Sequence, residues 1–138
     1  MAASLPVTIG ADDYSVVSLH LHWPWPHRQS HQVEGLARFL SSGADTGRRG
    51  RIIMAGDLNA APWSHTADRL ASITGSRIVH GYRPSWLATE FPQAMRPWIG
   101  LPIDHAFAPP SMVIAGARTL EGAGSDHLPV LVDLGAAK

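Results

Sequence analysis

Alternating apolar and polar residues near the start of the chain predict two β-strands. Residues 5–9 form the first stretch and residues 15–22 the second, with Gly-Ala-Asp-Asp at residues 10–13 between them. Glycine and aspartate favour a tight turn, so the two strands are expected to form a hairpin. Side chains alternate along a strand, so the second strand should have one apolar face and one polar face with two histidines. The apolar face consists of Val17, Leu19 and Leu21, and the polar face of Ser18, His20 and His22.

The spacing of apolar residues then changes to that of a helix. Within residues 28–41, apolar residues recur three or four positions apart, and Gly43 would end the helix. Residues 51–55 are almost wholly apolar, as expected for a short strand covered on both faces. A second helix is predicted after this strand. Its cap would be Ser64 or Thr66, its last residue Ile73 and its stop Gly75.

The second half of the chain is richer in strands than in helices. Residues 76–80 could form a short strand, while residues 83–102 are expected to be irregular because they hold four prolines and two tryptophans. Three further strands are predicted at residues 103–108, 112–115 and 128–134. Strands alternating with helices, and then several strands in a row, predict an α+β fold in which helices lie outside the sheets.

Composition is that of a globular domain without a strong charge. The 138 residues suffice for one domain, with 45% apolar and 16% charged residues. Eleven basic and eleven acidic side chains cancel, which excludes a global attraction to nucleic acid or anionic lipid. The absence of cysteine excludes disulfides and thiolate zinc sites. We find no apolar run long enough to span a membrane and no signal-peptide pattern, so the compartment stays open, with the cytoplasm as the default expectation.

Two short motifs place an acidic residue and a second polar group beside a predicted strand. Gly-Asp-Leu-Asn at residues 56–59 follows the buried strand, and Asp57 and Asn59 would point the same way if the backbone is extended. A carboxylate beside an amide can activate a water and orient a phosphate oxygen. Ser-Asp-His opens the last strand, where Asp126 and His127 could divide metal binding and phosphate contact between them. Either motif alone could instead be a turn or a polar loop.

Two further places carry candidate chemistry. Asp104 lies on an otherwise apolar strand, so it should need a partner, either a catalytic histidine or one of the arginines. His20 and His22 share a face that would also suit a metal, although a structural role is the simpler interpretation for His22. The tryptophans are expected to serve packing rather than base stacking, because stacking would also require a basic groove. They are Trp23, Trp25, Trp63, Trp86 and Trp98.

Taken in order, these motifs resemble those of the endonuclease/exonuclease/phosphatase family. The family pattern is a strand ending in His-Leu, then Gly-Asp-Phe-Asn, then Ile-Asp-His, then Ser-Asp-His-Xaa-Pro-Val. The resemblance spans residues 15–134, and residues 56–59 and 125–127 are its strongest parts. The runs Trp-Pro-Trp-Pro and Arg-Pro-Ser-Trp are similar to one bacterial branch. Leu58 stands where phenylalanine is usual, and Ser85 stands where threonine is usual.

The resemblance implies a fold, a cofactor and a role for each motif residue. Residues 1–138 would form a single partial domain, the C-terminal half of a four-layer α/β/β/α sandwich of the DNase I type. The activity would be hydrolysis of a phosphate ester with Mg²⁺ or Mn²⁺, hard cations that favour oxygen ligands. By this resemblance, Asp57 would deprotonate the attacking water and Asn59 would hold a phosphate oxygen. His20 would contact the phosphate or assist the leaving group, and Asp126 would bind the metal. His127, oriented by Asp104, would stabilise the transition state.

The resemblance also implies that the first half of the family's domain is missing. In the family, an early Asn and a Glu on the next strand hold the metal, and both precede the His-Leu strand. The three glutamates here, Glu34, Glu90 and Glu121, do not follow a strand in that way. We therefore expect a fragment, or a start misplaced at Met1, that is weak or inactive alone. Its uncovered sheet surface would favour self-association.

Two functions remain open. The first is a phosphoesterase half-domain whose substrate could be a nucleic acid, an inositol phosphate or a phospholipid headgroup. The alternative is a non-catalytic half-domain that acts as a binding or assembly module. Specificity is expected to lie in the loops at residues 23–29 and 83–100, and neither loop decides the substrate.

Overall fold

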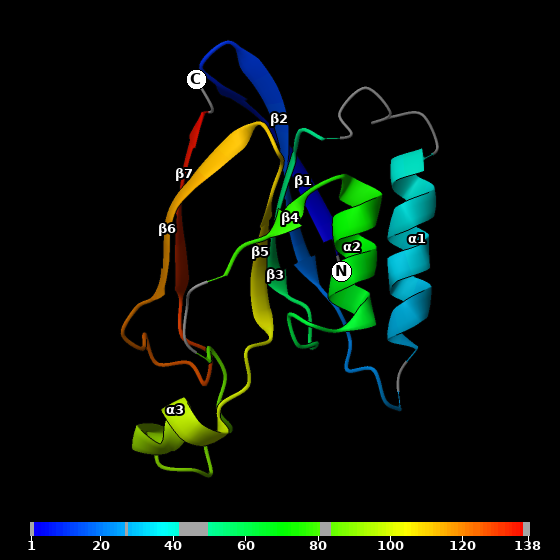
Figure 1. Cartoon of the computed structure of the whole chain (residues 1–138). Coiled ribbons are helices and arrows are strands. Elements are labelled where there is room, and N and C mark those ends of the chain that lie inside the picture. The colour runs from blue at the N-terminus through cyan, green and yellow to red at the C-terminus, as the bar shows by residue number, and fades with distance from the viewer. Residues whose placement is uncertain (1, 27, 42–49, 81–83, 137–138) are drawn as a thin grey trace.

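The chain forms a five-stranded sheet with two helices on one face and a two-stranded sheet on the other (Figure 1). This layered α+β architecture confirms the expected fold class. None of the described helices is long and apolar enough to cross a bilayer. Gly43 and Arg83 lie outside the described residues. The structure, a computed structural model, describes residues 2–26, 28–41, 50–80 and 84–136.

The large sheet has the order β1-β2-β3-β5-β4, with β2 and β3 parallel and the other pairs antiparallel. The predicted hairpin is present, and Gly10 in its turn has a φ of 65°, a conformation that glycine adopts without steric cost. The predicted strand at residues 15–22 begins three residues earlier and ends two earlier, because its pairing partner is β1. The strands are β1 (Ala2–Ile9), β2 (Asp12–His20), β3 (Ile52–Asp57), β4 (Arg77–Ile78) and β5 (Asp104–Ala108).

The register of this sheet aligns three polar residues at one end. His20, the last residue of β2, pairs with Asp57, the last residue of β3. Asp57 in turn pairs with Asp104, the first residue of the antiparallel strand β5. Neighbouring strands lie about 4.8 Å apart, so the side chains of paired residues come within reach of one another. Strand pairing therefore collects residues that are far apart in the sequence.

Two helices cover one face of the large sheet, as Figure 1 shows. They are α1 (Gln29–Ser41) and α2 (His65–Thr74), close to the predicted ranges. The side chain of Ser64 accepts a hydrogen bond from the backbone N–H of Ala67 and caps α2. Gly75 follows α2 in the left-handed region, with a φ of 66°. Both ends of this helix were predicted from the sequence.

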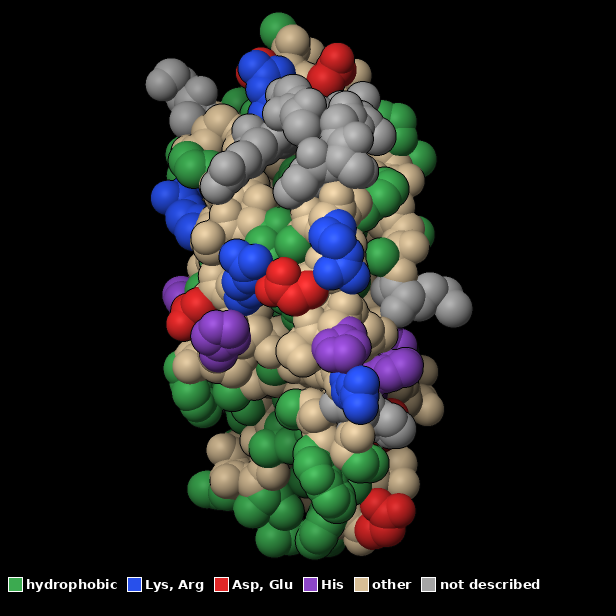
Figure 2. All heavy atoms as spheres, turned by 90° about the vertical axis from the view of Figure 1, so that its right-hand side faces the viewer, with side chains coloured by type: hydrophobic (Ala, Val, Ile, Leu, Met, Phe, Trp, Pro, Cys, Tyr) green, Lys and Arg blue, Asp and Glu red, His purple; other side chains and the backbone are tan. Residues whose placement is uncertain are grey.

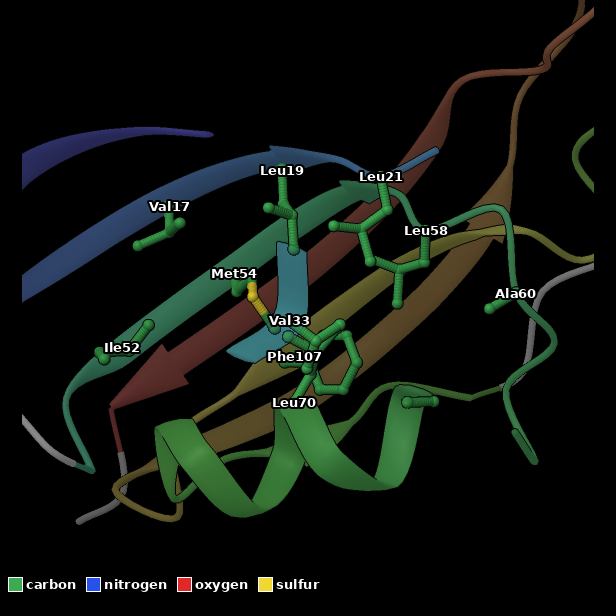
Figure 3. Close-up of a cluster of buried hydrophobic side chains, with 11 residues drawn as sticks. Val17, Leu19, Leu21, Val33, Ile52, Met54, Leu58, Ala60, Leu70 and Phe107 are labelled. Atoms are coloured by element: carbon green, nitrogen blue, oxygen red, sulfur yellow. The ribbon is translucent and has the colours of Figure 1, made fainter. Parts of the chain in front are cut away.

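The main hydrophobic core lies between the large sheet and these helices. Figure 3 shows the apolar side chains of β2 on the same side of the sheet as Met54 and Phe107. Leu70 of α2 and Val33 of α1 complete the cluster from the helix side. Burying a side chain of this size contributes roughly 1.5–3 kcal/mol. The core thus fixes β2, β3 and β5, the strands that carry the aligned polar residues.

The opposite face of the large sheet is covered by the hairpin of β6 (Met112–Thr119) and β7 (Val130–Ala136). β6 is four residues longer than predicted, because a bulge between Ile114 and Gly116 interrupts the alternation while pairing with β7 continues. A second, smaller cluster joins this hairpin to β5. It consists of Val79, Ala106 and Ala108, with Ile114, Ala117, Val132 and Leu134 packed against them.

The segment predicted to be irregular contains two short helical turns. These are the 3₁₀ turn η2 (Gln93–Met95) and the four-residue helix α3 (Arg96–Ile99). Proline is tolerated in the first turn of a helix, because the N–H that it lacks has no partner there, and Pro97 occupies such a position. The turns were not predicted because four prolines in this segment indicated irregular structure.

The expectation that the tryptophans serve packing is wrong for three of them. The side chains of Trp25, Trp63 and Trp98 are 85%, 78% and 80% exposed. They lie in loops and in the short α3, outside the layers that form the two cores. Figure 2 shows hydrophobic side chains gathered at the end of the molecule below α1 and α2. Trp86, in contrast, is partly buried against other groups.

Candidate active site

The aligned strand ends form the centre of a polar site. His20 Nε2 lies 3.6 Å from Asp57 Oδ2. His127 comes from the loop before β7, and its Nδ1–H donates a 2.8 Å hydrogen bond to Asp104 Oδ2. Asp104 thus has a histidine partner, as one of the two sequence interpretations proposed, rather than an arginine. The two His–Asp pairs lie side by side because Asp57 and Asp104 are paired across β3 and β5.

The loop after β3 holds the Asp57 carboxylate by its own backbone and side chain. The Asn59 N–H donates to Asp57 Oδ1 at 2.8 Å, and Asn59 Nδ2 donates to Oδ2 at 3.2 Å. Asn59 has a φ of 47°, so the expectation of an extended backbone is wrong. Asparagine is one of the few residues that tolerate this conformation. The side chains of Asp57 and Asn59 therefore come together because the backbone turns at Asn59, and not because residues two apart share a strand face.

The environment of Asp57 makes its carboxylate unusually basic. Burial raises the pKa of Asp57, because the charged form loses solvation, and the nearby Asp104 charge acts in the same direction. The N–H of Asn59 and the two histidines oppose this rise only in part. A carboxylate with a raised pKa is better suited to accept a proton from water near neutral pH.

Asp126 points toward a tryptophan. Its Oδ2 accepts a 2.8 Å hydrogen bond from Trp86 Nε1, and this bond lowers the pKa of Asp126. Ser125 Oγ donates to the other oxygen at 3.3 Å. The Trp86 ring also packs against the His127 ring, with centroids 6.4 Å apart. Trp86 therefore touches both residues of the Asp-His pair in the Ser-Asp-His motif.

Three of the site residues could hold a divalent ion. Each of Asp57, Asp104 and His127 offers one ligand atom, and these atoms lie within 4.8 Å of one another. Two carboxylate oxygens and an imidazole suit Mn²⁺, and the oxygens also suit Mg²⁺. Asp126, the residue predicted to bind the metal, is not among these three. None of the glutamates within the described part of the chain lines the pocket at this site.

The site opens into a pocket of about 460 Å³ at the end of the sheet. Such a volume is within the usual range for small-ligand sites. All of the predicted site residues except Asp104 line it, and Asp104 reaches it through His127. The lining residues are His20, Leu21, His22, Trp23, Asp57, Asn59, Trp86, Asp126 and His127.

Gln29 supports the site and was not recognised from the sequence. Its side chain is 3% exposed, and Nε2 donates to the carbonyls of His22 at 2.7 Å and Leu58 at 2.8 Å. Its Oε1 accepts a 2.7 Å hydrogen bond from Thr66 Oγ1. One buried amide thus joins the segment after β2 to the loop after β3 and to α2. A glutamine at a helix start is usually exposed, so the sequence carried no signal for this role.

Two further buried side chains hold the loops of the site. His105 Nε2–H donates to the Ala60 carbonyl at 2.8 Å, and burial lowers the pKa of this histidine. Arg96, 7% exposed, donates to the carbonyls of Ser85 and Asp126. Arg96 lies in the segment expected to be irregular, and no pattern distinguished it from the surface arginines.

The comparisons with known proteins agree with this geometry. The sequence profile of the family described as "Endonuclease/Exonuclease/phosphatase family" matches residues 2–127. No curated protein matches the chain. Several solved structures share its fold at identities below 25%, a level that shows the fold alone.

Three of these structures illustrate the similarity. The endonuclease domain of TRAS1, a telomere-specific non-LTR retrotransposon, is 19% identical with a TM-score of 0.64, over 94% of this chain and 59% of that one. An endonuclease/exonuclease/phosphatase from Beutenbergia cavernae DSM 12333 is 20% identical with a TM-score of 0.63, over 98% and 39%. The human Nocturnin catalytic domain is 16% identical with a TM-score of 0.59, over 99% and 52%.

The chain spans about half the length of the solved structures that it matches. The family profile, in contrast, covers nearly all of this chain, including the motifs at residues 56–59 and 125–127. The chain therefore belongs to the endonuclease/exonuclease/phosphatase family.

Proposed function

We propose that this chain carries the water-activating half of a metal-dependent phosphoesterase site. The observation that carries the proposal is Asp57, a partly buried carboxylate with a raised pKa at the mouth of a pocket. It lies beside His20 on one side and the Asp104–His127 pair on the other. A base next to two imidazoles suits in-line attack of water on a phosphorus atom.

Each pocket residue has a role in this proposal. Asp57 accepts the proton of the attacking water, and His20 contacts the phosphate or assists the leaving group. His127, held by Asp104, stabilises the charge that develops on the phosphoryl oxygens. Asn59 donates to a phosphate oxygen, which requires Nδ2 to leave one of its present acceptors, Asp57 Oδ2 or the Leu21 carbonyl.

A divalent ion completes the proposal. Asp126 lines the same pocket and has no part in the proposed proton transfer, so its carboxylate would hold Mg²⁺ or Mn²⁺. When bound, the ion would neutralise the phosphate and polarise its oxygens. Because Asp57 and Asp126 face the same pocket, an ion there would also offset their repulsion of an anionic substrate.

The substrate class is a phosphate ester. Solved structures that share the fold include an endonuclease domain and a mannosyl-6-phosphatase, which supports either a diester or a monoester substrate. Nucleic acid, inositol phosphate and phospholipid headgroups all contain such groups. Because the chain spans about half of its structural relatives, we propose that residues from a further half-domain raise its activity.

The test is hydrolysis of bis(p-nitrophenyl) phosphate by the purified chain with Mg²⁺, with Mn²⁺ and with EDTA. The proposal expects slow, metal-dependent release of p-nitrophenol that Asp57→Ala abolishes. Adding a separately expressed N-terminal half-domain from a longer relative should raise the rate. Metal-dependent turnover that survives Asp57→Ala would overturn the assignment of the base. The lack of any turnover, even with the added half-domain, would overturn the proposed function.

A second candidate function is supported by the groove between the two sheets. This apolar groove of about 490 Å³ is lined by residues of β3, β5 and β7, including Ile53, Val132 and Leu134. Such a surface suits a binding or assembly module that pairs with a partner or a second copy. Light scattering of the purified chain tests this alternative. A stable oligomer without turnover favours it, while a monodisperse monomer with turnover argues against it.

A further inference from the structure

One side of the pocket is built from two indole rings. Trp23 lies in the segment after β2, and Trp86 lies beside the loop that carries Asp126 and His127. Their ring centroids are 5.9 Å apart with an angle of 70° between the planes, an edge-to-face arrangement. The hydrogen bond from Trp86 Nε1 to Asp126 fixes the second ring in place. Trp86 therefore packs against Trp23 and limits the movement of its ring.

Trp23 keeps surface available on the pocket side. It lines the pocket and remains 41% exposed despite its contact with Trp86. An edge-to-face contact covers at most one face of a ring, so it does not account for both faces of Trp23. An indole held by a second ring at the mouth of a polar pocket suits a planar ligand group, because stacking removes apolar surface from both partners.

The charges of the pocket restrict the ligand further. Its lining contains Asp57 and Asp126 but, within the described residues, no lysine or arginine. Within the described lining, an anionic ligand therefore depends on a bound ion or on its uncharged parts for affinity. The pocket volume of about 460 Å³ also suits a ligand of small-molecule size. Affinity for such a ligand must come from the ring as well as from its phosphate.

We propose that Trp23 is a stacking platform for a nucleobase, and that the site acts on a small nucleotide ester. This inference rests on the proposed function and adds its substrate class. The phosphate would lie near Asp57 and His127, and the base of the attached nucleoside would lie on Trp23. Trp86 would act as a positioning residue for Trp23.

The experiment compares a nucleotide with the matching sugar phosphate, which carries a hydroxyl at C1′ in place of the base. Binding of adenosine 5′-monophosphate and of ribose 5-phosphate to the chain, with Mg²⁺ present, is followed by NMR of the five indole N–H signals. We expect adenosine monophosphate to bind about tenfold more tightly and to shift the Trp23 and Trp86 signals most. Trp23→Ala should remove this difference, whereas Trp23→Phe should retain most of it because a ring remains. Thermal melts confirm that both variants fold.

Trp25→Ala is the matched control, because Trp25 is also exposed but does not line the pocket. It should leave the difference between the two ligands unchanged. Equal binding of the two ligands, a difference that survives Trp23→Ala, or an equal effect of Trp25→Ala would each overturn the inference. Failure of both ligands to bind, together with metal-dependent hydrolysis of bis(p-nitrophenyl) phosphate, overturns the inference alone. Failure of both binding and hydrolysis overturns the proposed function as well.

Discussion

The two sides of the pocket are built in different ways. On the polar side, His20, Asp57 and Asp104 lie at the ends of paired strands, and buried side chains such as Gln29 hold the adjoining loops. On the aromatic side, Trp23 lies in a proline-rich loop and remains partly exposed. Groups that react with a phosphate must be held within a fraction of an ångström, while groups that contact the remainder of a substrate need less precision. We therefore assign the proposed chemistry to the polar side and the proposed substrate specificity to the aromatic side.

The largest expected effect is a loss of kcat when residues at the centre of the polar side are replaced. Asp57→Ala and His127→Ala should each lower kcat by at least ~10²-fold, the usual scale for a general base or a preorganised electrostatic group. His22→Ala should do far less, because His22 lines the pocket but lies beyond the end of β2. Steady-state rates on a generic phosphodiester, with the half-domain supplied, provide the measurement. A His22 effect equal to that of His127 would show that the wrong histidine was assigned.

A smaller effect should follow from loosening the polar side without touching its reacting groups. Gln29→Met removes the donors to the carbonyls of His22 and Leu58, which should cost about 1–3 kcal/mol of stability. We expect kcat to fall about tenfold with KM nearly constant, because the loop carrying Asp57 shifts slightly. Ser30→Ala on the exposed neighbouring position is the control. A rise in KM with unchanged kcat would contradict a positioning role.

The contact between the two sides can be tested at Trp86. Trp86→Phe keeps a ring beside Trp23 but removes the N–H that donates to Asp126 Oδ2. If Asp126 binds the ion, the Mn²⁺ dissociation constant should rise about threefold, because a single partly buried hydrogen bond that orients the carboxylate contributes modestly. Water-proton relaxation measures this constant without requiring turnover. Unchanged Mn²⁺ affinity would show that the Trp86 hydrogen bond does not support metal binding.

The smallest expected effect is a change in pH dependence of stability at His105. Burial lowers the pKa of this histidine below its usual value of 6.5, so the unfolded chain takes up this proton more readily than the folded chain. The free energy of unfolding should therefore decrease as pH falls below about 6.5, until the lowered pKa of the folded state is reached. His105→Gln should flatten this decrease below about pH 6.5. Urea unfolding of the wild type and the variant at several pH values, with EDTA present, measures the free energy of unfolding. If that free energy has the same slope against pH in both proteins, the prediction is contradicted.

The sequence alone predicted most of the strands, the two long helices and the candidate site residues. Alternation predicted β2, and local signals predicted both ends of α2, because Ser64 and Gly75 act on the backbone directly beside them. The motifs around Asp57 and Asp126 were recognisable because the family pattern keeps those residue types in a fixed local order. The resemblance to the family supplied the partnership of Asp104 and His127, and the structure places the two 2.8 Å apart.

The tertiary structure decided what depends on contacts between distant segments. Gln29, Arg96 and His105 support the site only because other loops place carbonyl groups against their side chains. Strand pairing, not local propensity, set the register that aligns His20, Asp57 and Asp104. The exposure of Trp25 and the pocket position of Trp23 likewise depend on which layers cover each segment. A local pattern specifies backbone conformation and chemistry, but burial and hydrogen-bond partners arise only when the folded layers meet.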